Sequence, residues 1–194
     1  MPIPFRDQDD VEELGAAAFL RIETDPGRPG YRGALFQINA RGEPIEFTYN
    51  RVATPNSFLW RPGDVRRAAA KKLTATLLAT CSSVPKVILG RADEIASDLF
   101  CLDIRVAVPV CRIATALQTA GFSSLESPET LHRATDDPEG EQLHLFWFPE
   151  LAGDQAPARR LVRDLHLRGL LLEPFERAAQ GIHEVFGEGS NGAS

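Results

Sequence analysis

The sequence predicts one α+β domain: a mainly antiparallel sheet with a β-hairpin at residues 33–52, helices packed on one face of the sheet, and a C-terminal helical pair. Two alternating segments joined by a glycine-containing turn indicate the hairpin, and apolar residues spaced for a helix follow them. The chain ends in two further segments with helical spacing. With 194 residues and 43% hydrophobic content, the chain is large enough to bury one substantial core.

The clearest local pattern is the hairpin. A first strand is expected at residues 17–23, and the hairpin strands at 33–39 and 43–52. Gly42 fits the left-handed position of a turn with a bulge. Alternating apolar residues should share one buried face of this hairpin, namely Phe36, Ile38, Ile45 and Phe47.

The remaining elements follow in order along the chain. Pro62 and Gly63 precede Asp64, which is expected to be the N-cap of an amphipathic helix that runs to about Cys81. After it we expect a strand at 84–89, a short helix at 92–100, a strand at 104–110, a hairpin of 131–135 with 142–148, and helices at 157–168 and 173–186. In domain terms, residues 1–15 form a mobile acidic segment, 16–186 the single domain, and 187–194 a disordered tail.

Composition restricts the class of protein. The net charge of −6 argues against a general nucleic-acid coat protein, which is normally basic. The three cysteines, Cys81, Cys101 and Cys111, are too few for a disulfide framework and suit a reducing compartment. Neither a secretory signal nor an uncharged apolar run of membrane-spanning length is present, so a soluble cytoplasmic protein without membrane contact is predicted.

The strongest functional signal is the group of cations in residues 61–72. Five of the 21 basic residues fall in this stretch, at the start of a predicted helix, where the helix dipole disfavours positive charge. They are Arg61, Arg66, Arg67, Lys71 and Lys72. They form either a binding site for an anion or an acidic partner, or only the solvated face of an amphipathic helix. A second cluster, Arg159, Arg160, Arg163 and Arg168, would strengthen the first interpretation if it adjoined this one.

Metal and catalytic signatures are weak. The cysteines lack the close pairing of zinc ligands, and no serine-nucleophile motif or phosphate loop is present. His132 and His144 would face each other if the second hairpin turned at Pro138, but a third ligand is not evident. We therefore expect no metal, no cofactor and no assigned catalytic residue. An enzyme with an unrecognised site that uses His132, His144 or Asp164 remains an alternative.

Two apolar features suggest a partner. Trp60 lies beside the basic stretch, and residues 145–148 are apolar without interruption, which indicates a strand covered on both faces. That cover is either the chain's own core alone, including its C-terminal helices, or is supplied in part by a partner subunit. In the second case Trp60, Phe146 and Trp147 are the candidate interface. The leading hypothesis is a non-catalytic accessory or adaptor subunit that binds a protein partner or self-associates as an oligomer. The alternative is a nucleotide- or nucleic-acid-binding subunit that uses the basic helix.

Overall fold

The computed structural model describes residues 14–54, 57–115, 121, 123–132, 142–151, 153 and 155–187. The expected mobile lead at 1–15 and disordered tail at 187–194 lie almost entirely outside these residues. Within the described part of the chain, no helix combines the length and apolar character needed to cross a membrane.

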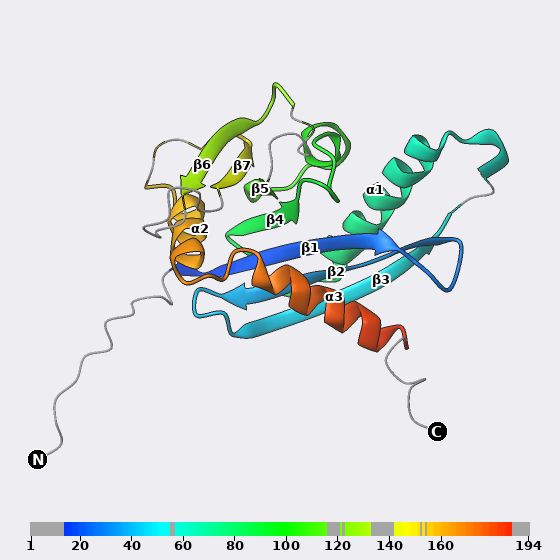
Figure 1. Ribbon diagram of the computed structural model, residues 1–194, viewed down its shortest axis with the longest axis horizontal. Coiled ribbons are helices and arrows are strands. Elements are labelled where there is room, and N and C mark those ends of the chain that lie inside the picture. Colours follow the sequence, from blue (N-terminus) through cyan, green and yellow to red (C-terminus); the bar gives the residue numbers. More distant parts are fainter. Residues whose placement is uncertain are drawn as a thin grey trace, which may run out of the picture.

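The centre of the fold is one seven-stranded sheet with the strand order β3-β2-β1-β4-β5-β7-β6 (Figure 1). Its strands are β1 (Ala16–Thr24), β2 (Gly30–Asn39), β3 (Pro44–Ala53), β4 (Val87–Arg91), β5 (Val110–Ala114), β6 (Ser127–His132) and β7 (Gln142–Phe148). The pairs β1–β4 and β4–β5 are parallel, and the other pairs are antiparallel. The predicted α+β class with a mainly antiparallel sheet is therefore confirmed.

The helices lie on both faces of this sheet, not on one face as expected. They are α1 (Pro62–Thr80), α2 (Pro157–Leu167) and α3 (Glu173–Val185), with short turns η2 (Ser57–Leu59) and η3 (Leu99–Asp103). Phe19 of β1 packs in the core beneath α2 and α3, and the next residue, Leu20, packs in the core beneath α1. Both residues are fully buried, because β1 is a central strand covered on its two sides.

The predicted hairpin is present as β2 and β3. Phe36 pairs with Phe47 across the strands, Gly42 has a φ of 85°, and the register shifts between Gln37 and Ile38, as a bulge requires. The expected buried face is only partly right, because Ile45 is 49% exposed. The reason is position: β3 is an edge strand of the sheet, and its outer residues meet water.

The second hairpin also forms, but in another register. Thr130 pairs with His144, and His132 pairs with Gln142, so the two histidines are not opposite each other. Between the two hairpins, the strand expected at 104–110 begins only at Val110, and residues 92–100 form turns that lead into the π-helical turn η3.

Candidate functional site

The topology singles out one end of the sheet. After β1 the chain turns to β2 on one side, and after β4 it proceeds to β5 on the other side, although β1 and β4 are parallel neighbours. In open sheets with parallel strands, ligands bind in the crevice at the carboxyl ends of the strands where the connections diverge in this way. The start of α1 lies at this crevice, because the Arg66 guanidinium donates to the main-chain oxygens of Asp93 and Glu94, at 3.2 and 3.1 Å.

Charged side chains line these strand ends. Arg21 of β1 is ion-paired with Glu94, and Arg91 of β4 donates to Asp93 at 3.0 Å and lies 3.4 Å from Glu94. Burial tends to raise the pKa of Asp93, but the hydrogen bond and charge of Arg91 outweigh it, and the pKa of Asp93 is lowered. For Glu94 the balance is opposite, since burial raises its pKa despite Arg21 and Arg91. Among the described residues, no group of three His, Cys, Asp or Glu side chains is arranged to hold a metal ion.

Among the described residues, three hollows adjoin α1. A cavity of about 200 Å³ lies between its first turns and the segment after β4, and Arg66, Arg67, Glu94, Asp98, Leu99 and Asp103 contribute to its lining. A second cavity of about 170 Å³ lies at the end of β1 and shares Arg66. A third of about 440 Å³ lies between the end of β3 and α1, with Lys72 at its edge.

The basic helix begins one turn earlier than Asp64. The N-cap residue is Arg61, which makes no side-chain capping bond, and Pro62 occupies the first helical position. The expected Asp64 cap is wrong because Pro62, with its φ fixed and no N–H to satisfy, starts the helix before it. The predicted apolar stripe is correct: Val65, Ala69, Leu73 and Leu77 are all buried.

The five predicted cations have different environments. Arg66 bonds to main-chain oxygens as described, and Arg67 forms two hydrogen bonds with Asp103, at 2.6 and 2.9 Å, and one with Asp98 at 3.2 Å. The hydrogen bond with Asp103 raises the pKa of Arg67. Arg61, Lys71 and Lys72 are exposed, and no described residue forms an ion pair or hydrogen bond with their side chains.

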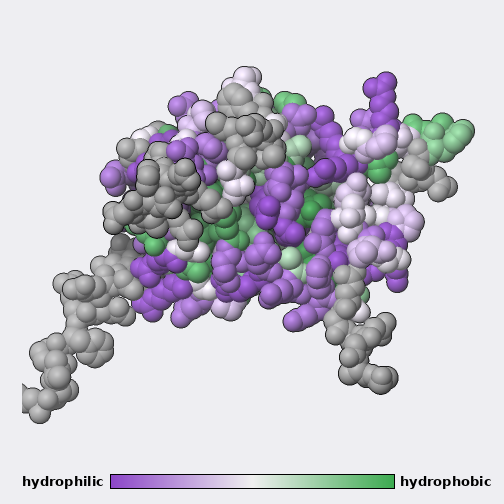
Figure 2. Space-filling model, in the orientation of Figure 1, coloured by the Kyte–Doolittle hydropathy of each residue, from purple (hydrophilic) through white to green (hydrophobic). Residues whose placement is uncertain are grey.

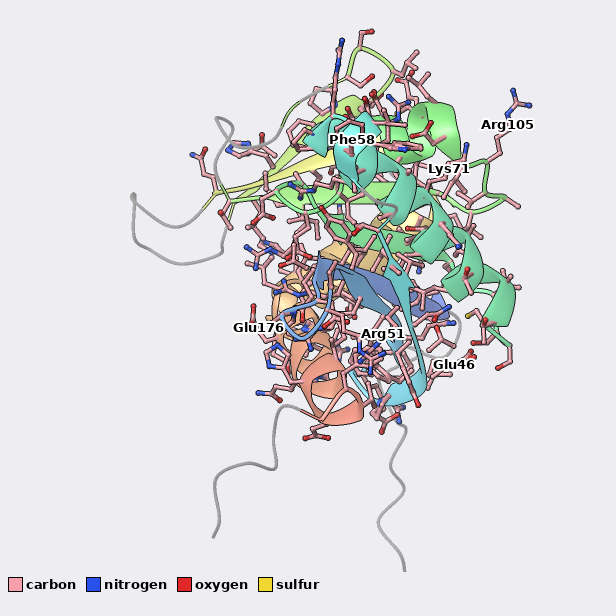
Figure 3. The ribbon with its side chains drawn as sticks, turned by 90° about the vertical axis from the view of Figure 1, so that its right-hand side faces the viewer. Glu46, Arg51, Phe58, Lys71, Arg105 and Glu176 are labelled. Atoms are coloured by element: carbon pink, nitrogen blue, oxygen red, sulfur yellow. The ribbon has the colours of Figure 1, made fainter. Side chains whose placement is uncertain are left out.

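One further cation extends this surface. Arg105 is exposed, and Figure 3 shows it directed outward from the same upper part of the molecule as Lys71. Asp103, two residues before it, is close enough to Lys71 for that charge to contribute to lowering the Asp103 pKa, after the larger effect of the Arg67 hydrogen bond. Sequence analysis missed Arg105 because 38 residues separate it from Arg67 in the chain.

An apolar tip precedes the basic helix. Phe58 is 91% exposed, Leu59 85% and Trp60 45%. Hydrophobic side chains project from the body at the upper right of Figure 2, where η2 and the start of α1 lie, and Phe58 is at the near end of α1 in Figure 3. Trp60 is thus accessible, as an interface residue must be, and its role remains a prediction.

The other two predicted interface residues are not accessible. Trp147 is fully buried and Phe146 is 2% exposed. Trp147 packs in the core beneath α2, its indole N–H donates to Glu129 at 2.9 Å, and Phe146 packs against Ala92 and Ala114 on the other side. The expectation that a partner covers β7 at Phe146 and Trp147 is therefore wrong, because the chain covers both faces itself.

The second cationic cluster does not adjoin the first. It lies on α2, whose apolar residues pack on the opposite face of the sheet from α1. Arg159 and Arg163 are paired there with Glu129, at 3.3 and 2.9 Å, in a network that also binds Trp147. Arg159 and Arg163 thus hold α2 to β6, and the cluster gives no support to the anion site on α1.

The residues of the enzyme alternative are also dispersed. The Asp164 carboxylate is 2.9 Å from Arg168 on its own helix, and His144 Nδ1 is 3.4 Å from the Thr130 hydroxyl. Of His132 only the backbone is described. Neither Asp164 nor His144 lies at the β1–β4 crevice, so these residues assemble no common site there.

Comparison with known proteins identifies the fold. No protein-family model matches the sequence, and no curated protein sequence matches it. Among solved structures, the chain is similar to endonuclease V from Streptomyces avermitilis, with a TM-score of 0.56, 12% identity, and 90% of this chain and 82% of that chain covered. It is similarly related to endonuclease V from Bacillus subtilis, with a TM-score of 0.53, 15% identity, and 88% and 79% covered.

The chain is more weakly similar to Argonaute from Marinitoga piezophila, with a TM-score of 0.47, 10% identity, and 88% of this chain and 30% of that chain covered. A likeness at this level carries no argument. At these identities the endonuclease V likeness shows a shared fold. It also corrects the leading hypothesis from the sequence: the proteins that share the fold are named as nucleases, not as protein-binding adaptors.

The charged crevice itself escaped the sequence analysis, although a signal was present. Arg21 and Glu23 directly follow the apolar run at 17–20, and Arg91, Asp93 and Glu94 follow the run at 87–89. Polar residues at the ends of buried strands mark the edge where sites form, but only the strand order reveals that these two edges are adjacent.

Proposed function

We propose that this protein binds nucleic acid, with the exposed cations of α1 contacting the phosphate backbone beside the β1–β4 crevice. One observation carries the proposal: Arg61, Lys71 and Lys72 are exposed on one helix and form no hydrogen bond or ion pair with a described residue, in a chain whose net charge is −6. An acidic protein that gathers unneutralised cations on one helix has a local anion-binding surface rather than a generally basic one.

The position of Arg61 at the N-cap is unfavourable for the helix alone. Positive charge in the first turn opposes the helix dipole by about 0.3–1 kcal/mol per exposed group. The only acidic residue in the first turn of α1 is Asp64, against Arg61 at the N-cap and Arg66 and Arg67 just after it. Arg61 costs stability at this position and forms no hydrogen bond or ion pair with a described residue, which is understandable if it binds an external anion.

The apolar tip suits a nucleic-acid strand with accessible bases. Trp60 and Phe58 are exposed next to Arg61, so aromatic rings and a cation are presented together. Aromatic side chains stack on unpaired bases while neighbouring cations follow the phosphates, and each stacked base contributes about 1–3 kcal/mol. We therefore infer a single-stranded nucleic acid, or a single-stranded part of one, as the preferred ligand.

The test is a comparison of salt dependence. Wild type and an Arg61→Gln/Lys72→Gln variant are titrated with labelled single-stranded and duplex oligonucleotides at several salt concentrations. Each lost phosphate contact makes the plot of log affinity against log salt shallower by about 0.7 for single strands and about 0.9 for duplexes. The variant should bind at least about tenfold more weakly at low salt, with the single-strand slope reduced by about 1.4.

A matched control separates this surface from net charge. The Arg160→Gln/Lys86→Gln variant also removes one arginine and one lysine charge. Both residues are exposed and lie outside α1: Arg160 is on α2 and Lys86 is just before β4. This control should bind as wild type does. Equal losses in both variants, or no oligonucleotide binding by wild type, would refute the proposed function. Anionic lipid vesicles serve as a second ligand, because binding to vesicles without binding to oligonucleotides would also refute it.

A further inference from the structure

The segment that follows β4 is acidic and faces the basic helix. Residues 92–103 contain four acids, Asp93, Glu94, Asp98 and Asp103, and no basic residue. Three of the four, Glu94, Asp98 and Asp103, line the cavity of about 200 Å³ together with Arg66 and Arg67. One side of the cation surface is therefore in contact with negative charge from the same chain.

The contact with Arg67 resembles the contact that a phosphate would make. Asp103 presents two oxygens to Nε and Nη2 of Arg67, and Asp98 presents a third to Nη1. A guanidinium binds carboxylate and phosphate with the same planar, two-bond geometry. While these bonds persist, most of the Arg67 donors are unavailable to nucleic acid.

The exposure of the pair makes exchange possible. The Arg67 side chain is 47% exposed and that of Asp98 45%, whereas that of Asp103 is 14% exposed, so an incoming phosphate can reach the guanidinium from its open side without unfolding the protein. Ion pairs as open to water as Arg67–Asp98 contribute little to stability. The acidic segment therefore competes with phosphate, but it does not lock the site.

We propose that Asp98 and Asp103 form an internal competitor for the nucleic-acid site: they hold Arg67 in the free protein, and the ligand must displace them to use it. This inference rests on the proposed function and deepens it. Arg61, Lys71 and Lys72 make the first contacts, and Arg67 joins only when a phosphate replaces the carboxylates. The result is a lower affinity, and a weaker response to salt, than four free cations would give.

Neutralising the competitor should strengthen binding through Arg67. We expect an Asp98→Asn/Asp103→Asn variant to bind a single-stranded oligonucleotide about 3–10-fold more tightly at low salt. Its slope of log affinity against log salt should become steeper by about 0.7, because one more phosphate is neutralised. In an Arg67→Gln background, the same two substitutions should give neither the steeper slope nor most of the added affinity.

Two controls keep the result interpretable. Glu150→Gln/Glu184→Gln removes two exposed acids that lie outside α1 and the segment 92–103, and it measures the effect of net charge alone. Asp98→Asn alone, at the more exposed acid, gives a smaller gain of the same kind and decides the question if the double variant does not fold. Circular dichroism checks folding of every variant.

The outcomes separate the two proposals. The internal competitor would be overturned if Asp98→Asn/Asp103→Asn raised the affinity equally in the wild-type and Arg67→Gln backgrounds. It would also be overturned if that rise were no larger than the rise given by Glu150→Gln/Glu184→Gln. If Arg61→Gln/Lys72→Gln still weakened binding in the same experiment, the proposed function would stand without it. If neither wild type nor Asp98→Asn/Asp103→Asn bound any oligonucleotide, both would be overturned.

Discussion

The buried ion pair between Arg112 and Glu126 should be the most sensitive polar contact in the protein. Both side chains are 2% exposed, and the pair is bidentate, with Nε–Oε1 and Nη2–Oε2 distances of 2.6 and 2.7 Å. Arg112 also donates to the main-chain oxygens of Ile95, at 3.0 Å, and Gly121, at 2.7 Å. It thereby ties β5 to the segment after β4 that carries the acids facing α1.

Removing one partner of this pair leaves the other charge buried without compensation. For Arg112→Met we expect a loss of about 3–5 kcal/mol in the free energy of unfolding. For Glu126→Gln the loss should be at the lower end of that range, because Arg112 keeps its two carbonyl acceptors. The double variant Arg112→Met/Glu126→Leu should lose less than the sum of the two single losses by at least about 2 kcal/mol, since it leaves no buried charge.

Urea denaturation followed by circular dichroism measures all four proteins of this cycle. For a chain of this size, the loss in Arg112→Met should also lower Tm by roughly 10 °C. Single variants whose free energy of unfolding lies within about 1 kcal/mol of wild type, or strictly additive losses, would show that the two buried charges do not depend on each other as their geometry indicates.

Two other predictions concern the tip and the loop after α1. Trp60→Ala should weaken single-strand binding about 5–100-fold by loss of stacking, measured by titration of a labelled oligonucleotide. Trp60→Phe keeps an aromatic ring and should bind nearly as wild type does. Equal binding by both variants would argue against stacking. Glu46 accepts main-chain N–H bonds from Ser82, at 2.8 Å, and Ser83, at 3.1 Å, and the Ser82 bond is the main cause that lowers the pKa of Glu46 from 4.5 to about 2. This stabilisation by ionised Glu46 is full above the unfolded pKa of about 4.5 and is lost as pH falls towards 2. Glu46→Gln should therefore be less stable than wild type by about 1–2 kcal/mol at pH 7, a value reduced for solvent screening because the group is partly exposed. Chemical denaturation should show this difference shrinking below pH 4.5, and a constant difference from pH 7 to pH 3 would contradict the prediction.

The sequence was most informative where a pattern is local. The hairpin of β2 and β3 followed from alternation and one glycine, and the buried stripe of α1 followed from helical spacing. Both depend on interactions between residues that are close in the chain, so the period of the pattern was sufficient. The start of α1 at Pro62, before the expected cap Asp64, shows the usual limit of such reasoning at the boundary of an element.

The features that were missed depend on long-range arrangement. The burial of Trp147 follows from α2 crossing β7, and the apolar run alone did not distinguish this helix from a partner subunit as the cover. The fate of Arg67 depends on Asp103, which lies 36 residues away. The separation of the two cation clusters likewise follows from α1 and α2 lying on opposite faces of the sheet, which no periodicity encodes.

The parallel pairing of β1 with β4 also has a consequence for folding. Strands β1, β2 and β3 follow each other as antiparallel neighbours, whereas β1 meets β4 only after the chain has passed through the hairpin and α1. Pairings that close long loops form late, because their entropic cost precedes their gain. The crevice at this seam is therefore completed among the last parts of the molecule, and a ligand bound across it would stabilise the fully assembled sheet over partly folded forms.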